Sequence, residues 1–359
     1  MKRITGLVLA MVMLMPVSGV RAEEEVVTLT VAQAVELAMA NSKQLRIHQS
    51  EIEAGRVAIR EAEEARRNIT RINVSQPNTA LLRDGFFVRQ AEMNQRLAER
   101  RLSDFKVQLE LQVVTEYYGL RAAIDMRERA YLARHFANEN LWTVNQMLQR
   151  GVASFLDSLQ AGTAKLRADS EREAARRNVE QARRVLNTTL GLPLSKQLEL
   201  VDELPVSSRD LPTPDEIMDM ALGNMFEVIQ AREHAVLAEF ALEIFDRHIP
   251  TNMFAYQRQA IDTAVALERR DAVVANARLA VHRRHNDMLT ARGNVRVARE
   301  TLEQVHQQYM AAIVRYDVGL ITANELVTSL GAWQDAMMGY ERAKLDYAVA
   351  VANYEILLD

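Results

Sequence analysis

The chain has 359 residues, of which 48% are hydrophobic, 26% are charged and 6% are aromatic. This balance excludes a disordered chain and a bundle of membrane-spanning helices. Losing the first 22 residues would remove Lys2, Arg3 and Arg21, leaving 41 basic against 48 acidic residues and a net charge of −7. An acidic chain of this kind is a poor ligand for nucleic acid or anionic lipid.

Residues 1–22 have the order of a secretory signal peptide. Lys2 and Arg3 come first, an apolar run follows over residues 4–16, and Ala22 precedes three glutamates. The apolar run is short for a bilayer span, which disfavours a membrane anchor. The chain has no cysteine that a lipid could modify or that could form a disulfide. We therefore expect cleavage after Ala22 and export to the periplasm or cell envelope.

Two very long helices are predicted, one in each half of the chain. Apolar residues recur at three- and four-residue steps along both. They are Leu102, Phe105, Leu109, Val113, Tyr117 and Leu120 in the first and Leu302, Val305, Tyr309, Ile313 and Tyr316 in the second. The first helix, over residues 87–150, would be about 95 Å long at about 1.5 Å per residue. A rod of this length cannot bury its stripe alone, so we expect antiparallel, coiled-coil-like neighbours from its own chain and from other copies.

The last predicted helix carries an aromatic stripe at heptad-like steps. Its members are Trp333, Met337, Tyr340, Tyr347, Val351 and Tyr354, and Lys344 is the exception among them. We interpret the stripe as packing core in preference to a ligand site.

The chain reads as a tandem duplication. "TVAQAVELAMANSKQLRI" from Thr30 aligns without gaps with "TPDEIMDMALGNMFEVIQ" from Thr213, and "GVASFLDSLQ" from Gly151 aligns with "GLITANELVT" from Gly319. Thr30 and Thr213 are each followed by Gln or Glu three residues later, which predicts a capping box at both helix starts. We predict a first repeat over residues 23–191, a proline-bearing linker over 192–214 and a second repeat over 215–359.

These matched segments resemble the TolC-like outer membrane efflux proteins. The resemblance rests on "LTVAQAVELAMANSKQL", "RGVASFLDSLQAGTAKLRAD" and "LNTTLGLPL" in the first repeat and on "YDVGLITANELVTSL" and "AKLDYAVAVANYEILLD" in the second. It implies a homotrimer whose long helices form a tunnel, the exit duct of a tripartite efflux pump or type I secretion system. It also implies a periplasmic adaptor protein at the tunnel entrance and an inner-membrane transporter that feeds the duct.

The resemblance assigns roles to residues near the two predicted helix turns. Gly151 and Val152, and likewise Gly319 and Leu320, match the tips that contact the adaptor, although such a glycine also simply separates two helices.

Three more positions match family residues that lie at the tunnel entrance and control its opening. Asp157 and Tyr316 match a hydrogen-bonded link between tip hairpins, and Glu325 matches an acidic ring at the constriction. The residues alone would favour a solvated helix face for Glu325. Ile321 stands where some family members carry an arginine of the closing network, so this lock would be weaker or built differently.

The sequence departs from the family where a membrane β-barrel should be. Family members supply two strands per repeat, and each strand needs about nine to eleven residues. Residues 66–75 alternate only weakly before Pro77 breaks the pattern, and residues 246–262 offer a turn at Pro250, Thr251 and Asn252 and then resume a helical pattern. We therefore expect an all-α chain that forms a trimeric helical barrel, with the β-barrel lost or reduced to short loops. Membrane contact at that distal end stays open.

Other constellations carry less weight. His282 and His285 share a helix face, but the flanking arginines repel a cation, so an exposed face is favoured over a metal site. The sequence contains no GxSxG, P-loop or GxGxxG pattern. We therefore expect no enzyme, cofactor or metal. The alternative to a duct is a coiled-coil scaffold or spacer of the cell envelope that binds partners and conducts nothing.

Overall fold

The computed structural model describes residues 27–68, 76–204 and 211–358. The predicted signal peptide, the weakly alternating residues 69–75 and part of the predicted linker lie outside these ranges. Within them the chain forms nine helices and two short strands. These are β1 (Val27–Leu29), α1 (Val31–Asn41), α2 (Lys43–Asn68), α3 (Pro77–Arg83), α4 (Phe86–Gln149), α5 (Phe155–Leu190), β2 (Leu198–Leu200), α6 (Pro214–Asn224), α7 (Phe226–His248), α8 (Phe254–Asp317) and α9 (Ala323–Glu355).

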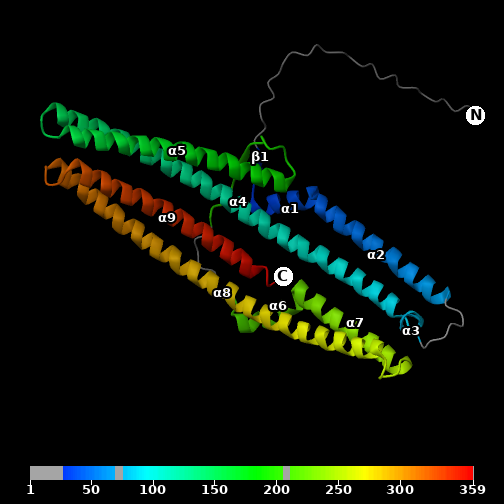
Figure 1. Cartoon of the computed structure of the whole chain (residues 1–359). Coiled ribbons are helices and arrows are strands. Elements are labelled where there is room, and N and C mark those ends of the chain that lie inside the picture. The colour runs from blue at the N-terminus through cyan, green and yellow to red at the C-terminus, as the bar shows by residue number, and fades with distance from the viewer. Residues whose placement is uncertain (1–26, 69–75, 205–210, 359) are drawn as a thin grey trace, which may run out of the picture.

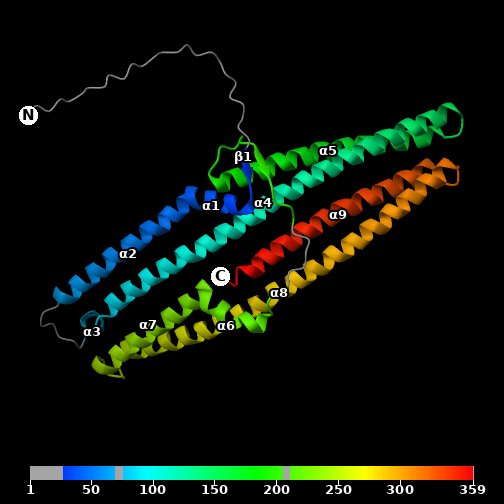
Figure 2. The ribbon, with the colours of Figure 1, turned by 180° about the vertical axis from the view of Figure 1, so that it is seen from behind.

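The helices form a long wall, shown from its two sides in Figures 1 and 2. The hairpins α4/α5 and α8/α9 lie side by side through α4 and α9, and their turns are at the same end of the molecule. Toward the other end, α2 packs on α4 and α7 fills the space between α4 and α8. The wall is therefore about four helices wide throughout. Its two margins are α8 on one side and α5 followed by α2 on the other.

The same order of helices occurs twice, except that α3 has no counterpart between α7 and α8. The long helices α4 and α8 each have 64 residues, and the short helices α1 and α6 each have 11. Both predicted capping boxes are present, at Thr30 with Gln33 and at Thr213 with Glu216. These features agree with a duplication, while the predicted repeat boundaries stay a prediction.

A small group of elements, β1, β2 and α1, packs on the wall near the middle of α4. We call this group the strap and this part of the wall the waist. The strands pair in parallel, with Val27 opposite Leu198 and Leu29 opposite Leu200. Tyr117 of α4 is fully buried beneath them. Its hydroxyl donates to the carbonyl oxygen of Leu29 at 2.8 Å and accepts from the amide of Asp202 at 3.0 Å. The strap is thereby fixed to one face of α4.

The predicted apolar stripes form the core. Leu109, Val113, Tyr117 and Leu120 are buried under the strap. Met337, Tyr347 and Tyr354 of α9 are also buried. Trp333 stacks on Tyr309 with ring centroids 5.1 Å apart and an interplanar angle of 11°. The aromatic stripe of the last helix thus packs against α8.

Lys344, the exception in that stripe, has a counter-charge. Its ammonium lies 2.6 Å from Glu341, whose side chain is only 2% exposed and lies 3.6 Å from Arg129 of α4. A buried carboxylate therefore joins α9 to α4.

The end of the wall far from the hairpin turns is closed by short connections. The predicted turn around Pro250 separates α7 from α8. The predicted break after α2 contains the short helix α3, which begins at Pro77 in its first turn, where proline is well tolerated. Asp84 lies 2.9 Å from His248 and 3.4 Å from Arg247, so the α3–α4 turn is tied to the end of α7. Among the described residues no helix has the length and apolarity needed to cross a membrane.

Candidate functional site: the paired hairpin tips

The two hairpins turn in the same way. Gly151 and Gly319 adopt left-handed backbone angles, with φ of +73° and +74°. The next amide then reaches back five residues, from Val152 to the carbonyl of Met147 at 2.9 Å and from Leu320 to that of Arg315 at 2.8 Å. This is the Schellman motif, in which glycine takes the backbone angles that other residues rarely adopt. Glycine is therefore required by the turn itself.

Each turn leads directly into a capping box. At the start of α5, Asp157 accepts from both the amide and the hydroxyl of Ser154 at 2.8 Å. At the start of α9, Glu325 accepts from the amide of Thr322 at 2.7 Å and from its hydroxyl at 3.0 Å. The backbone bonds, followed by the hydroxyl bonds, hold the pKa of both carboxyls below their usual values.

The residues that the two halves share at the tips thus have a local structural reason. Gly and Ser or Thr lie in a five-residue connection that occurs twice, and Asp or Glu lies in the first turn of the helix that follows. The apolar side chains at the apex have no such reason. Val152 and Leu320 are 75% and 74% exposed, and exposed apolar residues at matching positions of two neighbouring turns are typical of a contact surface.

Tyr316 lies just behind the tips and is buried. Its hydroxyl donates to the sulfur of Met147 at 2.9 Å, so it links α8 to α4. Burial raises the pKa of Tyr316, and the charge of Asp157 raises it further. The expected partner, Asp157, is thus close enough to act electrostatically but uses one carboxylate oxygen for the Ser154 cap. Ile321 is half-buried in the same apolar cluster.

Two rows of exposed apolar side chains, which the sequence analysis missed, run up from the tips. On α5 they are Phe155, Leu156, Leu159 and Leu166. On α8 they are Met310 and Val314, and Val318 follows directly after the end of that helix. Leu159 lies two residues from buried Ala161, and Val314 lies two residues from both Ala312 and Tyr316. Two residues of α-helix turn a side chain by about 200°, so both rows point away from the core. Both rows could have been found in the sequence, because their apolar residues recur mostly at three- and four-residue steps.

Among the described residues no cluster of three or more His, Asp or Glu side chains could hold a metal ion. The ring of His285 packs on Tyr354 with centroids 5.3 Å apart.

Comparison with known proteins gives a likeness in structure only. No protein-family model and no curated protein matches the sequence. The outer membrane protein VceC from Vibrio cholerae superposes with a TM-score of 0.72 at 12% identity, over 91% of this chain and 95% of that one. The outer-membrane channel OprN gives 0.73 at 16%, over 91% and 89%. The CmeC outer membrane channel of Campylobacter jejuni gives 0.66 at 12%, over 91% and 85%. The chain therefore has the long-helix fold of outer-membrane channels, as its resemblance to TolC-like proteins implied.

Proposed function

We propose that three copies of this chain form the helical exit duct of an efflux pump or type I secretion system in the cell envelope. The observation that supports this most is a wall with the fold of outer-membrane channels and apolar residues on both of its margins near the tips. The cargo would be small molecules or proteins that leave the cell. The likeness to channels also favours a non-enzyme.

Assembly follows from the two margins. The exposed row on α5 and the exposed row on α8 lie on opposite edges of the wall, so one copy cannot bury both. A head-to-tail contact between α8 of one copy and α5 of the next buries them together. Repeating that contact with a constant rotation closes a ring, and the resemblance sets the number at three.

The tips would be the entrance. Val152 and Leu320, beside Gly151 and Gly319, would be covered by the helical hairpins of a periplasmic adaptor, with an inner-membrane transporter behind it. Two apolar contacts per copy become six in a trimer, which favours a multivalent partner.

Three residues would control that entrance. Tyr316 and Asp157 would hold the hairpins together, and Glu325 would be repeated three times near the axis. Such a ring of carboxylates favours cations over anions.

The first test is the assembled state of the full chain without its signal peptide. Light scattering should give the mass of a trimer, and averaged electron micrographs should show a hollow cylinder. Leu159→Glu and Val314→Glu should each lower the mass to that of a monomer, because each places a charge in the contact. Val236→Glu is the matched control, since Val236 is exposed on α7, inside the wall rather than at a margin. A solid monomeric or dimeric rod would instead support the envelope scaffold and refute the duct.

The second test is transport in cells. Tyr316→Phe removes one hydroxyl, and Glu325→Ala removes one carboxylate and a cap. Each should change export or drug sensitivity at an unchanged level of assembled protein. If neither variant alters transport while trimers form normally, these residues do not gate the channel.

A further inference from the structure

Two large aromatic side chains of α4 are exposed in the tip half of the wall. Tyr131 is 60% exposed and Trp142 is 66% exposed. The only other tryptophan of the chain, Trp333, lies in the core against Tyr309. Tryptophan and tyrosine that stand out on a surface are characteristic of binding sites for other proteins.

Both aromatics lie on the face of α4 that the strap covers further along. Tyr117, Tyr131 and Trp142 are separated by 14 and 11 residues, which are close to four and three whole turns of α-helix. Tyr117 is the residue that the strap binds. The same face is therefore covered at the waist and bare from Tyr131 toward the tip.

Self-assembly through the margins leaves this face uncovered. In the tip half α4 packs against both α5 and α9, and α5 also touches α9, so α4 is enclosed by its neighbours on its core side. The proposed contact between α5 and α8 does not reach Tyr131 or Trp142. A partner that covers them would therefore have to contact this face directly.

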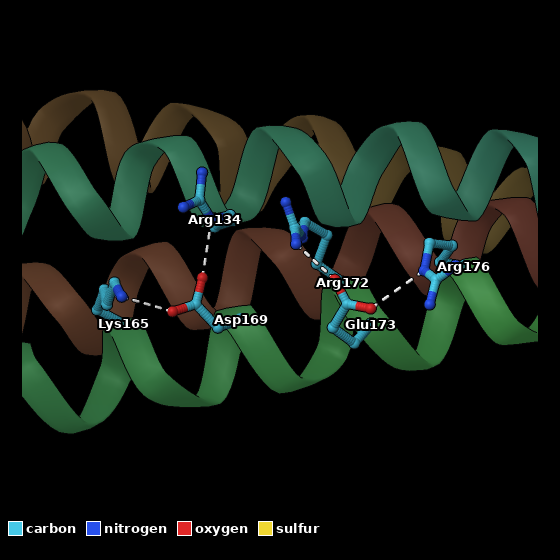
Figure 3. Close-up of polar contacts among 6 residues, drawn as sticks. All are labelled: Arg134, Lys165, Asp169, Arg172, Glu173 and Arg176. Carbon is cyan, nitrogen blue, oxygen red and sulfur yellow. Dashed lines mark hydrogen bonds and ion pairs between the residues drawn. The ribbon is translucent and has the colours of Figure 1, made fainter.

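The surroundings of Tyr131 are rich in arginine. A depression of about 400 Å³ beside its ring is lined by Arg127, Glu128, Arg172, Glu173 and Arg176. Glu173 is shared by the two guanidiniums of Arg172 and Arg176. In Figure 3 Arg172, Glu173 and Arg176 project from α5 in front of the ribbons, while α8 and α9 pass behind. The part of the lining that these three residues form therefore lies on the side away from the second hairpin.

This part of the hairpin is basic in an acidic chain. Segments 121–134 and 165–184 together carry eleven Lys or Arg and six Asp or Glu, whereas the whole chain has more acidic than basic residues. Two of the eleven do not add to the surface charge, because Arg129 pairs with Glu341 of α9 and Arg183 is buried. Arg134 and Lys165 already share Asp169, as Figure 3 shows. The remaining positive charge complements an acidic partner.

We propose that an acidic amphipathic α-helix of another protein lies along this face of α4, between the strap and the tip. Its apolar stripe would cover Tyr131 and Trp142, which are three turns apart, about 16 Å along a straight helix. Its carboxylates would bind Arg127, Arg172 and Arg176, and guanidiniums beside aromatic rings are the side chains that most often dominate such contacts. This surface is separate from the tips and does not depend on whether the chain conducts.

The chain has no cysteine, so single-cysteine variants test the proposal directly. Tyr131→Cys and Trp142→Cys are labelled with a maleimide, both as the purified assembly and in cells that naturally produce the chain. Val236→Cys on α7 is the control. Purified protein should react at all three positions. In cells, Tyr131→Cys and Trp142→Cys should react at least about tenfold more slowly than the control, as expected for a site more than about 90% occupied.

Two further variants separate the possible occupants. Adding Arg172→Glu and Arg176→Glu should restore labelling of Trp142→Cys in cells. A benzophenone attached at that cysteine should cross-link to an acidic helical segment of a different protein. Protection already in the purified assembly, a cross-link to this chain or to lipid, labelling in cells as fast as at Val236→Cys, or protection that survives the charge reversal would each overturn the proposal.

Discussion

The buried carboxylate between the two hairpins gives a quantitative test of how the wall is held. Glu341 is 2% exposed and lies 2.6 Å from Lys344 and 3.6 Å from Arg129. Removing one partner of a buried ion pair costs about 3–5 kcal/mol, because the other charge stays buried without compensation. Arg129 is half exposed, so its guanidinium can be solvated by water once Glu341 is gone. Only the ammonium of Lys344 then stays buried without its partner. We therefore expect Glu341→Ala to lower the free energy of unfolding by about 2–3 kcal/mol, just below that range.

The measurement is urea unfolding of the purified chain at one fixed protein concentration, since assembly also contributes to stability. Glu53→Ala is the matched control. Glu53 pairs with Arg56 at 2.6 Å, but both side chains are mostly exposed, so its loss should cost less than about 1 kcal/mol. Combining Glu341→Leu with Lys344→Met removes both charges and should recover most of the loss. If Glu341→Ala costs no more than the control, the carboxylate does not hold α9 to α4.

The other predictions concern the strap and the tips. Tyr117→Phe removes two hydrogen bonds, one buried bond to Leu29 at the end of β1 and one partly buried bond from Asp202 just after β2. It should cost about 2–3 kcal/mol, seen as faster amide exchange in β1 and β2; unchanged exchange would refute the anchor. Gly319→Ala should destabilise by about 1 kcal/mol because of its positive φ, whereas Gly331→Ala, inside α9, should stabilise by about 0.5–1 kcal/mol; equal signs in thermal unfolding would contradict this. Glu325 has a lowered pKa, so its cap is complete above the usual value of 4.5 and is lost as the pH falls through the folded pKa. Amide exchange at the start of α9 should accelerate there, but not in Glu325→Gln.

The features that could be predicted from sequence are those set by neighbouring residues. The stripe at Leu109, Val113 and Tyr117 predicts a buried helix face whatever covers it, and the structure confirms it. The capping boxes at Thr30 and Thr213 depend only on a residue three positions later. Because these interactions close within one or two helical turns, the sequence determines them almost completely.

The features that could not be predicted depend on which helices meet. In the sequence Lys344 interrupts the aromatic stripe of the last helix. In the structure Glu341 lies beside it and also lies close to Arg129 of α4. The bond from Tyr316 to Met147 joins residues 169 positions apart. Residue spacing within one helix carries no information about either contact. The helix α3 also lay in a segment read as a loop, because seven residues are too few for a periodic pattern.

Residues that the two tips share have a different significance for gating from residues in which the tips differ. Glycine, a hydroxyl residue and a carboxylate recur in both halves, and the Schellman turn and capping box explain all three without any channel. Their recurrence is thus no argument for a gate. The halves differ at Tyr316, whose counterpart is Leu148, and at Ile321, whose counterpart is Ala153. Only the second half places a buried hydroxyl between the hairpins, so a gate would depend first on Tyr316 and only then on the carboxylates near it.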